Sequence, residues 1–536
     1  MNVSPSTLRL PSLTRAAGGA DRLIGCAGVR LGTSVLATLL VAGCAIGPNY
    51  QRPSIVAPEA TRGQIEPAEA RSLADLPWWQ VFQDPVLQQL VAEAVVRNFD
   101  LQAAVFRIEQ FRQQVGVARA DLLPQLDYRG AASRQRSFQT TNLPNETFNL
   151  FLGSFNLAWE IDIWGRIRRA TESARAEYMA SEAFRRGVLL TLVGDVAQSY
   201  FELLELDREL EIARETTGSF QNTLDLFTRQ YKGGVGTRLE VARAAAAVAE
   251  AAAAIPDVER AIVAKENQLR TLLGRNPGDI ARGAPLAAQP AAAEIPVGLP
   301  AQLLERRPDM LEAEQAIVAA NANVGVAIGN FLPRLGLTSL YGGMNPEIEN
   351  VVKGSGNIWA IAGTLTGPIF QGGRLLSNYY ASKAVWEQAV RQYEAAVVNA
   401  FAEVSDALVS QDKLKEIRAQ KERQVAALQE AVEVSLKRYS AGDSTYFEVL
   451  EAQQQLFPAE NELARAMRDQ LIVVVLLYRA LGGGWDVDAE GWAPDVLPAA
   501  ATSSEPDVRA QTMAASSLAP SAASEGLCEA RGDSAP

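Results

Sequence analysis

The chain has 536 residues, a formal net charge of −12 at pH 7 and no histidine. The negative charge disfavours nucleic-acid binding, which depends on neutralising phosphates with Lys and Arg. The lack of histidine excludes Ser-His-Asp and Cys-His catalysis and imidazole metal sites. The three cysteines, Cys26, Cys44 and Cys528, have no metal-type spacing. We therefore predict that the chain is not an enzyme and holds no metal.

Residues 1–43 are typical of a lipoprotein signal peptide. Four arginines make the leading segment basic, and the apolar run from Leu31 to Val41 is too short to span a bilayer. The run ends in LVAGC, which resembles a bacterial lipobox and predicts that Cys44 becomes the acylated first residue. Residues 44–77 lack any period and are rich in Pro, Glu and Ala, so they are predicted to form an acylated N-terminal tether.

The body of the chain contains the same sequence pattern twice, about 208 residues apart. Three pairs of blocks have this offset to within one residue: VGVARADLLPQL at 115–126 with VGVAIGNFLPRL at 324–335, DIWGR with IFQGGR, and YKGGVGTRLEV at 231–241 with YSAGDSTYFEV at 439–449. Because all three hold one register, we predict two tandem structural repeats, 78–290 and 291–488. Residues 489–536 are rich in Ala, Ser and Pro and are predicted to form a disordered tail.

Each predicted repeat begins with a helix and a β-hairpin. Helices are expected over about 98–120 and 308–330, each ending before a shared Leu-Pro. Apolar residues then alternate with polar or small ones, for example from Phe155 to Ile161 and from Trp359 to Leu365, which predicts four strands in the chain. Four strands cannot close a barrel, so either the sheet is covered or several chains share it. The alternation fits a barrel in lipid and an ordinary soluble sheet equally well.

Two very long helices are predicted next, over about 165–231 and 373–439. Their apolar residues follow a 3-4-3-4 spacing, which is typical of a coiled-coil seam. A helix of about 65 residues is about 100 Å long, far beyond the usual length in a globular domain. Such a length indicates that the helices span a distance.

Both long helices are predicted to reverse into a second helix through a glycine turn. Gly234 and Gly442 suit the left-handed residue that ends a helix. Two Thr-x-x-Glu sequences then predict capping boxes at the start of the returning helices: Thr237 with Glu240, and Thr445 with Glu448. The hairpin and the helix turn of each repeat therefore lie at opposite ends of its long helix.

Five blocks of the sequence resemble one family. They are CAIGPNYQRP from Cys44, WWQVFQDPVLQQL at 78–90, WEIDIWGRIRRA at 159–170, LLERRPDMLEAEQAIVAANANVGVAIGNFLPRLGLT at 303–338 and LYRALGGGW at 477–485. The chain thus resembles the TolC-like outer-membrane efflux lipoproteins of the OprM/NodT type. The resemblance implies an α + β membrane protein, in which three chains share one transmembrane β-barrel that continues as a long α-helical coiled-coil barrel.

The same resemblance implies a function and a set of partners. It implies a passive exit duct for small molecules in a tripartite efflux pump of the resistance-nodulation-division (RND) type. The implied location is the outer membrane, with a lipid anchor on Cys44 and no other cofactor. The implied partners are two more copies of the chain, a periplasmic adaptor (membrane fusion) protein, an inner-membrane RND pump and outer-membrane lipid. Two alternatives stay open: a type I secretion duct, and a lipid-anchored coiled-coil adaptor without a pore.

A gate at the periplasmic helix tips is also implied, made of acidic and apolar rings. The positions that match the family's tip motif are Leu239, Glu240, Tyr439, Phe447, Glu448 and Glu451. A role in helix capping explains Glu240 and Glu448 as well as a role in the gate does. Glu451 lies beyond the cap, so capping does not explain it. In a threefold assembly each carboxylate becomes a ring of three like charges, which attracts cations. Four residues are expected to shape the turns themselves: Gly234, Thr237, Gly442 and Thr445.

Overall fold

The computed structural model describes residues 45–55, 77–136, 147–289 and 305–483. The predicted signal peptide, its lipidation site Cys44 and the predicted tail lie outside these residues, as do residues 56–76 of the predicted tether.

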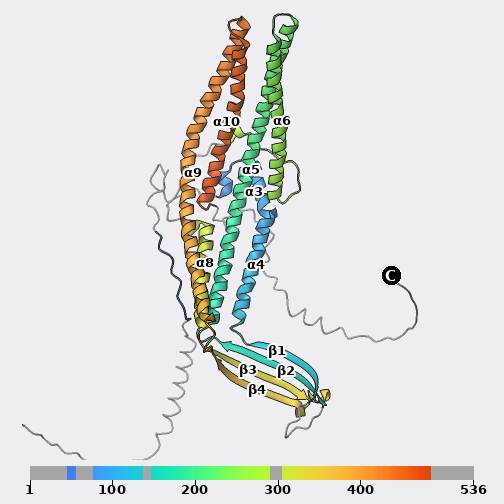
Figure 1. The fold of residues 1–536 in the computed structure, drawn as a ribbon, viewed down its shortest axis with the longest axis vertical. Helices are drawn as coiled ribbons and strands as arrows, with labels where there is room; N and C mark the ends of the chain where they lie inside the picture. The colour runs from blue at the N-terminus through green and yellow to red at the C-terminus, as the bar shows by residue number, and fades with distance from the viewer. Residues whose placement is uncertain (1–44, 56–76, 137–146, 290–304, 484–536) are drawn as a thin grey trace, which may run out of the picture. The chain divides into compact units, whose positions relative to one another are not determined.

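The same order of helices and strands occurs twice along the chain (Figure 1). The first set is α4 (Phe99–Ala120), β1 (Gln125–Arg136), β2 (Thr147–Ile161), α5 (Arg166–Lys232) and α6 (Arg238–Leu272). The second set is α8 (Pro308–Gly329), β3 (Arg334–Asn345), β4 (Asn357–Thr366), α9 (Arg374–Ala441) and α10 (Tyr446–Ala480). The shorter elements are α2 (Trp78–Val81), α3 (Pro85–Arg97), η2 (Leu286–Ala288), η3 (Ile348–Asn350) and η4 (Gly354–Gly356). The predicted helices and strands within the described residues are therefore confirmed.

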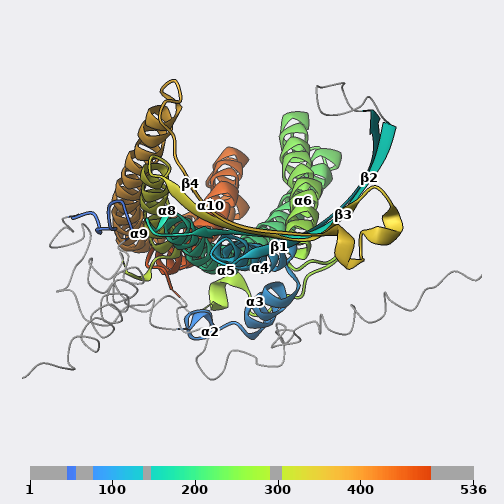
Figure 2. The same ribbon diagram turned by 90° about the horizontal axis from the view of Figure 1, so that it is seen from below.

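The four strands form one antiparallel sheet in the order β1-β2-β3-β4. Strands β2 and β3 pair directly, so the sheet joins the first set of elements to the second. Figure 2, seen from below, shows the strands as one strongly curved sheet. Among the described residues, β1 and β4 each have one edge without a strand partner.

One face of this sheet carries an exposed row of aromatic side chains. Cross-strand pairing places Tyr128 opposite Phe155, Phe155 opposite Tyr341, and Tyr341 opposite Trp359. All four are exposed in the chain, Tyr128 to 85% and Trp359 to 72%. Paired residues of antiparallel strands point to the same face. The row therefore crosses the whole sheet on one side.

Helix α5 is the central helix of the described structure. It packs against α4, α6, α8 and α10, whereas α9 packs mainly against α8 and α10. A stretch of α5 is apolar and long enough to cross a membrane, but most of that stretch is buried against other parts of the chain, as in the core helix of a soluble protein. In α9 the predicted apolar seam is confirmed by the burial of its members Tyr393, Val397, Ala400, Val404, Ala407 and Val425.

A buried carboxylate, Asp84, connects three parts of the fold. It caps the start of α3 by accepting a hydrogen bond from the Val86 amide at 2.8 Å. The Tyr200 hydroxyl donates to it at 2.9 Å from α5, and the Gln289 amide donates at 2.7 Å from the segment after η2. Burial alone would raise the pKa of Asp84, but these hydrogen bonds hold it below its ordinary value.

Candidate functional site

The helix tips lie at the end of each long helix that is distant from the sheet (Figure 1). Gly234 and Gly442 adopt positive φ angles of 80° and 83°, as predicted for the turns. The Gly236 amide donates to the Gln230 carbonyl at 3.1 Å, and the Asp443 amide donates to the Arg438 carbonyl at 2.9 Å. These hydrogen bonds satisfy carbonyl groups that the ends of α5 and α9 would otherwise leave free.

The predicted capping box at the start of α6 is confirmed. The Thr237 amide donates to the Glu240 carboxylate at 2.7 Å, and the Glu240 amide donates to the Thr237 hydroxyl at 3.2 Å. The Thr237 hydroxyl also donates to the carboxylate at 2.9 Å. The Glu240 carboxylate is therefore held at the start of its own helix, where Thr237 is exposed and Glu240 is half-buried.

The predicted capping box at the start of α10 is wrong. Thr445 is the N-cap residue, but its side chain makes no capping hydrogen bond. The Glu448 carboxylate instead accepts a hydrogen bond from Arg438, in the last turn of α9, at 3.0 Å. The Arg438 guanidinium carries the charge opposite to that of the carboxylate, so the carboxylate points to α9 and not back to its own helix start.

An aromatic cluster joins the tips of the two helix pairs. Tyr446 of α10 lies against Phe227 of α5, with ring centroids 3.9 Å apart, and Tyr439 of α9 lies 5.9 Å from the Phe227 ring. The Tyr439 hydroxyl donates to the Gln230 side-chain oxygen at 2.8 Å. Tyr439, predicted as a gate residue, is thus half-buried between the pairs. Burial raises the pKa of the neighbouring Tyr446 hydroxyl, which stays neutral.

Three predicted gate residues have exposed or weakly paired side chains. Leu239 and Phe447 are exposed to 60% and 57%. The Arg243 guanidinium of α6 lies 5.9 Å from the centre of the Phe447 ring, within the range of a cation–π contact. Glu451 accepts a 3.4 Å hydrogen bond from Gln455, and it has no ion pair among the described residues. Of the three carboxylates predicted for the gate, Glu451 therefore has the least intramolecular compensation.

Further along the same helices, a buried ionic cluster also joins α5 to α10. Glu205 and Glu209 of α5 are buried, and they pair with Arg468 at 2.9 Å and with Arg465 at 2.8 Å, respectively. Burial raises the pKa of Glu205 even beside Arg468. The sequence analysis did not single out these residues. The sequence does contain a signal for this cluster. Two carboxylates lie four residues apart on one predicted helix, and two arginines lie three residues apart on another.

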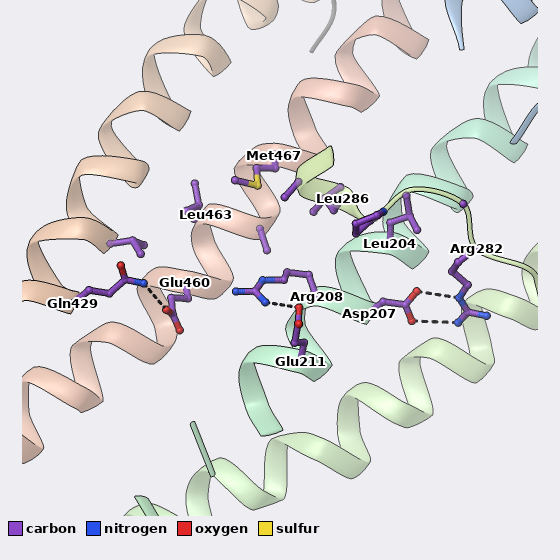
Figure 3. Close-up of a pocket in the computed structure, with 15 residues that line it drawn as sticks. Leu204, Asp207, Arg208, Glu211, Arg282, Leu286, Gln429, Glu460, Leu463 and Met467 are labelled. Atoms are coloured by element: carbon purple, nitrogen blue, oxygen red, sulfur yellow. Dashed lines mark hydrogen bonds and ion pairs between the residues drawn. The ribbon is translucent and has the colours of Figure 1, made fainter. Parts of the chain in front are cut away.

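A cavity of about 740 Å³ lies next to this cluster, between α5, α9, α10 and η2 (Figure 3). Its apolar wall includes Leu204, Leu286, Leu463 and Met467. Its polar side chains bind one another: Asp207 with Arg282 at 2.9 Å, Glu460 with Gln429 at 3.2 Å, and Glu211 with Arg208. Because these groups are already satisfied, the cavity resembles an irregularity in helix packing more than a site built for a ligand.

Two antiparallel helix pairs attached to a curved four-stranded sheet are the architecture of an outer-membrane channel. The chain belongs to the outer membrane efflux protein family, whose model matches residues 90–275 and 299–483. The second matched range begins 209 residues after the first.

Named relatives and solved structures agree with this assignment. The chain is 34% identical over 459 residues to the probable efflux pump outer membrane protein TtgC of Pseudomonas putida, a match that covers 83% of this chain and 94% of the relative. It is 30% identical over 452 residues to the cation efflux system protein CusC of Escherichia coli, covering 83% of this chain and 97% of CusC. The open-state crystal structure of the Neisseria gonorrhoeae outer membrane channel MtrE matches with a TM-score of 0.74 and 30% identity, over 82% of this chain and 99% of MtrE.

Proposed function

We propose that the chain is the outer-membrane exit duct of a tripartite RND-type efflux pump and conducts small molecules passively. Family membership supports this function, and TtgC and CusC are both named as efflux components. The energy would come from the inner-membrane pump, so the chain itself needs no catalytic site. We infer that it works as two tandem repeats, because the order of elements and the family match both occur twice.

The observation that carries the proposal is the sheet. Its aromatic row from Tyr128 to Trp359 is exposed, and β1 and β4 each have an open edge among the described residues. In a bilayer every backbone polar group needs a partner, which only a closed barrel gives to strands. Three copies would supply twelve strands, with the aromatic face toward lipid. A homotrimer in the outer membrane satisfies both requirements.

Exposed apolar side chains on the helices also support a trimer. They occur along the length of α4 and in the part of α9 near the sheet: Phe99, Phe106, Val117, Leu376, Tyr380 and Val385. Exposed apolar side chains gathered on one part of a surface mark protein interfaces. A ring of identical subunits uses two different surfaces of each chain, and α4 and α9 would provide them.

We infer that the helix tips form the gate and the docking end for a periplasmic adaptor. Closure would be held by the aromatic cluster and by the bond between Tyr439 and Gln230. Glu448 and Glu451 would form rings of three carboxylates, with Leu239 and Phe447 as apolar contacts. The like charges repel, so opening relieves that repulsion while loss of apolar contacts opposes it.

Two measurements test the proposal. Protein extracted from outer membranes should run as a heat-resistant trimer, and the purified trimer should conduct ions across planar lipid bilayers. A stable trimer without conductance would support the lipid-anchored adaptor without a pore, and a monomer would contradict the shared barrel. A deletion strain should become more sensitive to small toxic molecules. Loss of a secreted protein, with unchanged drug sensitivity, would support a type I secretion duct.

A further inference from the structure

Residues 45–55 are not a loose tether but lie along the helices. The Ile46 amide donates to the Trp164 carbonyl at 2.9 Å, just before α5 begins. The Asn321 side chain of α8 donates to the Pro48 carbonyl at 2.9 Å. Further along, the Tyr50 hydroxyl donates to Glu314, also on α8, at 2.8 Å. The segment therefore follows α8 away from the sheet.

One buried arginine holds the start of this segment. The Arg169 side chain is 4% exposed. Its guanidinium donates to the carbonyl oxygens of residues 45, 46 and 47 at 3.5, 3.3 and 3.3 Å, and to the Asn49 side-chain oxygen at 2.7 Å. It also pairs with Glu172 at 2.8 Å, which compensates its charge. The planar fork of an arginine is suited to hold several acceptors at once, and a lysine cannot replace it.

Three glycines let the segment approach the helices at backbone distance. A Cβ atom at Gly47, where φ is 113°, would lie 2.5 Å from the Gly325 Cα atom. A Cβ atom at Gly165, where φ is 76°, would lie 2.6 Å from the Ala45 Cα atom. No side chain fits at these points without a shift. The surface around Arg169 is thus shaped to receive this segment.

We propose that Arg169, Gly165 and Gly325 form a binding site for the chain's own mature N-terminal segment and thereby fix where the lipid anchor leaves the protein. Ala45 contacts Gly165, which lies between the end of β2 and the start of α5. Cys44 is bonded to Ala45, and consecutive Cα atoms are about 3.8 Å apart. The chain therefore leaves toward its anchor at the strand–helix junction. This inference rests on the proposed acylation and outer-membrane function.

The consequence is a fixed distance between the membrane surface and the sheet. An anchor on a flexible tether samples a wide volume, whereas an anchor clamped at the junction keeps the sheet next to the bilayer it must enter. Arg169 acts here as a positioning residue for insertion and touches neither the pore nor the cargo.

The test compares Arg169→Gln with Arg175→Gln, which removes an exposed arginine from the same helix. Hydrogen exchange of the peptide 45–55 should become at least tenfold faster in Arg169→Gln and stay unchanged in Arg175→Gln. The yield of outer-membrane trimers should fall several-fold in Arg169→Gln, with equal incorporation of an alkyne-labelled fatty acid at Cys44. Unchanged exchange or unchanged trimer yield in Arg169→Gln would overturn the inference.

A second pair of variants keeps Arg169 intact. A four-residue Gly-Ser insertion between Ala45 and Ile46 separates the anchor from the clamp, and the same insertion between Gln64 and Ile65 lies beyond the clamp. Only the first should lower the trimer yield; equal yields would also overturn the inference. Absence of label on wild-type Cys44, or of conductance by wild-type trimers, would refute the proposed anchor or function, while the exchange measurement still decides whether Arg169 holds the segment.

Discussion

The hydroxyl of Tyr439, in α9, donates a 2.8 Å hydrogen bond to the side-chain oxygen of Gln230, in α5. This bond ties the tips of two helix pairs that are far apart in sequence, beside the buried contact between Phe227 and Tyr446. The arrangement of the tips therefore depends on contacts between the two halves of the chain.

Tyr439→Phe should favour the open state. The change removes the hydrogen bond to Gln230 and keeps the ring packed on Phe227. A hydrogen bond of this kind contributes about 1 kcal/mol, so the open-to-closed ratio should rise roughly fivefold. Single-channel recordings would measure it. Tyr231→Phe, at the matching exposed position in the first half, is the control and should behave as wild type.

Neutralising the tip carboxylates should reduce cation selectivity. Glu451→Gln combined with Glu448→Gln removes two proposed rings of three negative charges. The reversal potential in a salt gradient should shift toward that of a non-selective pore, and Glu430→Gln, an exposed change on α9, should leave it unchanged. Equal selectivity in the double variant and the control would contradict a tip gate that contains these residues.

The two tip threonines should differ in their effect on stability. Thr237→Ala removes a capping box and should destabilise the start of α6 by about 1 kcal/mol. Thr445→Ala removes no capping hydrogen bond and should therefore change the stability of the start of α10 by much less. Hydrogen exchange of the first turns of both helices measures this difference, and equal effects would indicate that the two caps are equivalent in solution.

The cluster of Glu205 with Arg468 should behave as a buried pair. Either Glu205→Gln or Arg468→Gln alone should destabilise the protein by about 1–3 kcal/mol, because the remaining charge loses its 2.9 Å partner but keeps a second one, Arg465 at 3.6 Å from Glu205 or Asp469 at 2.7 Å from Arg468. The double variant should lose less stability than the sum of the losses in the two single variants. The more exposed pair of Asp195 with Arg479, at 3.5 Å, is the control and should contribute about 1 kcal/mol or less. Chemical unfolding of the purified protein measures all of these.

Asp84 should make stability depend on acid pH. Its pKa in the folded protein is lowered from 3.8, so its stabilising contribution is present above about pH 4 and is lost as the pH falls through the lowered value. Asp84→Asn should cost about 2 kcal/mol at pH 7 and flatten this acid dependence. Thermal unfolding between pH 3 and pH 7 measures both effects. Asp257→Asn, which alters an exposed ion pair, should leave both the stability at pH 7 and its acid dependence unchanged.

The sequence was sufficient for the elements but not for the contacts between them. Helix and strand positions follow from local periodicity, and the glycine turns at Gly234 and Gly442 follow from local geometry. The pairings of Tyr439 with Gln230 and of Arg468 with Glu205 join residues that are more than 200 positions apart, and no local pattern encodes them. The prediction for Thr445 failed because the Thr-x-x-Glu pattern does not reveal that Arg438 competes for Glu448.

The direct pairing of β2 with β3 has a consequence for biogenesis. The two strands come from opposite halves of the chain, so the four-stranded sheet cannot form until the second hairpin has been synthesised and exported. Contacts so distant in sequence form late and slowly. During that delay the aromatic strands are vulnerable to aggregation. Periplasmic holdase chaperones would therefore need to shield the first hairpin longer than the second.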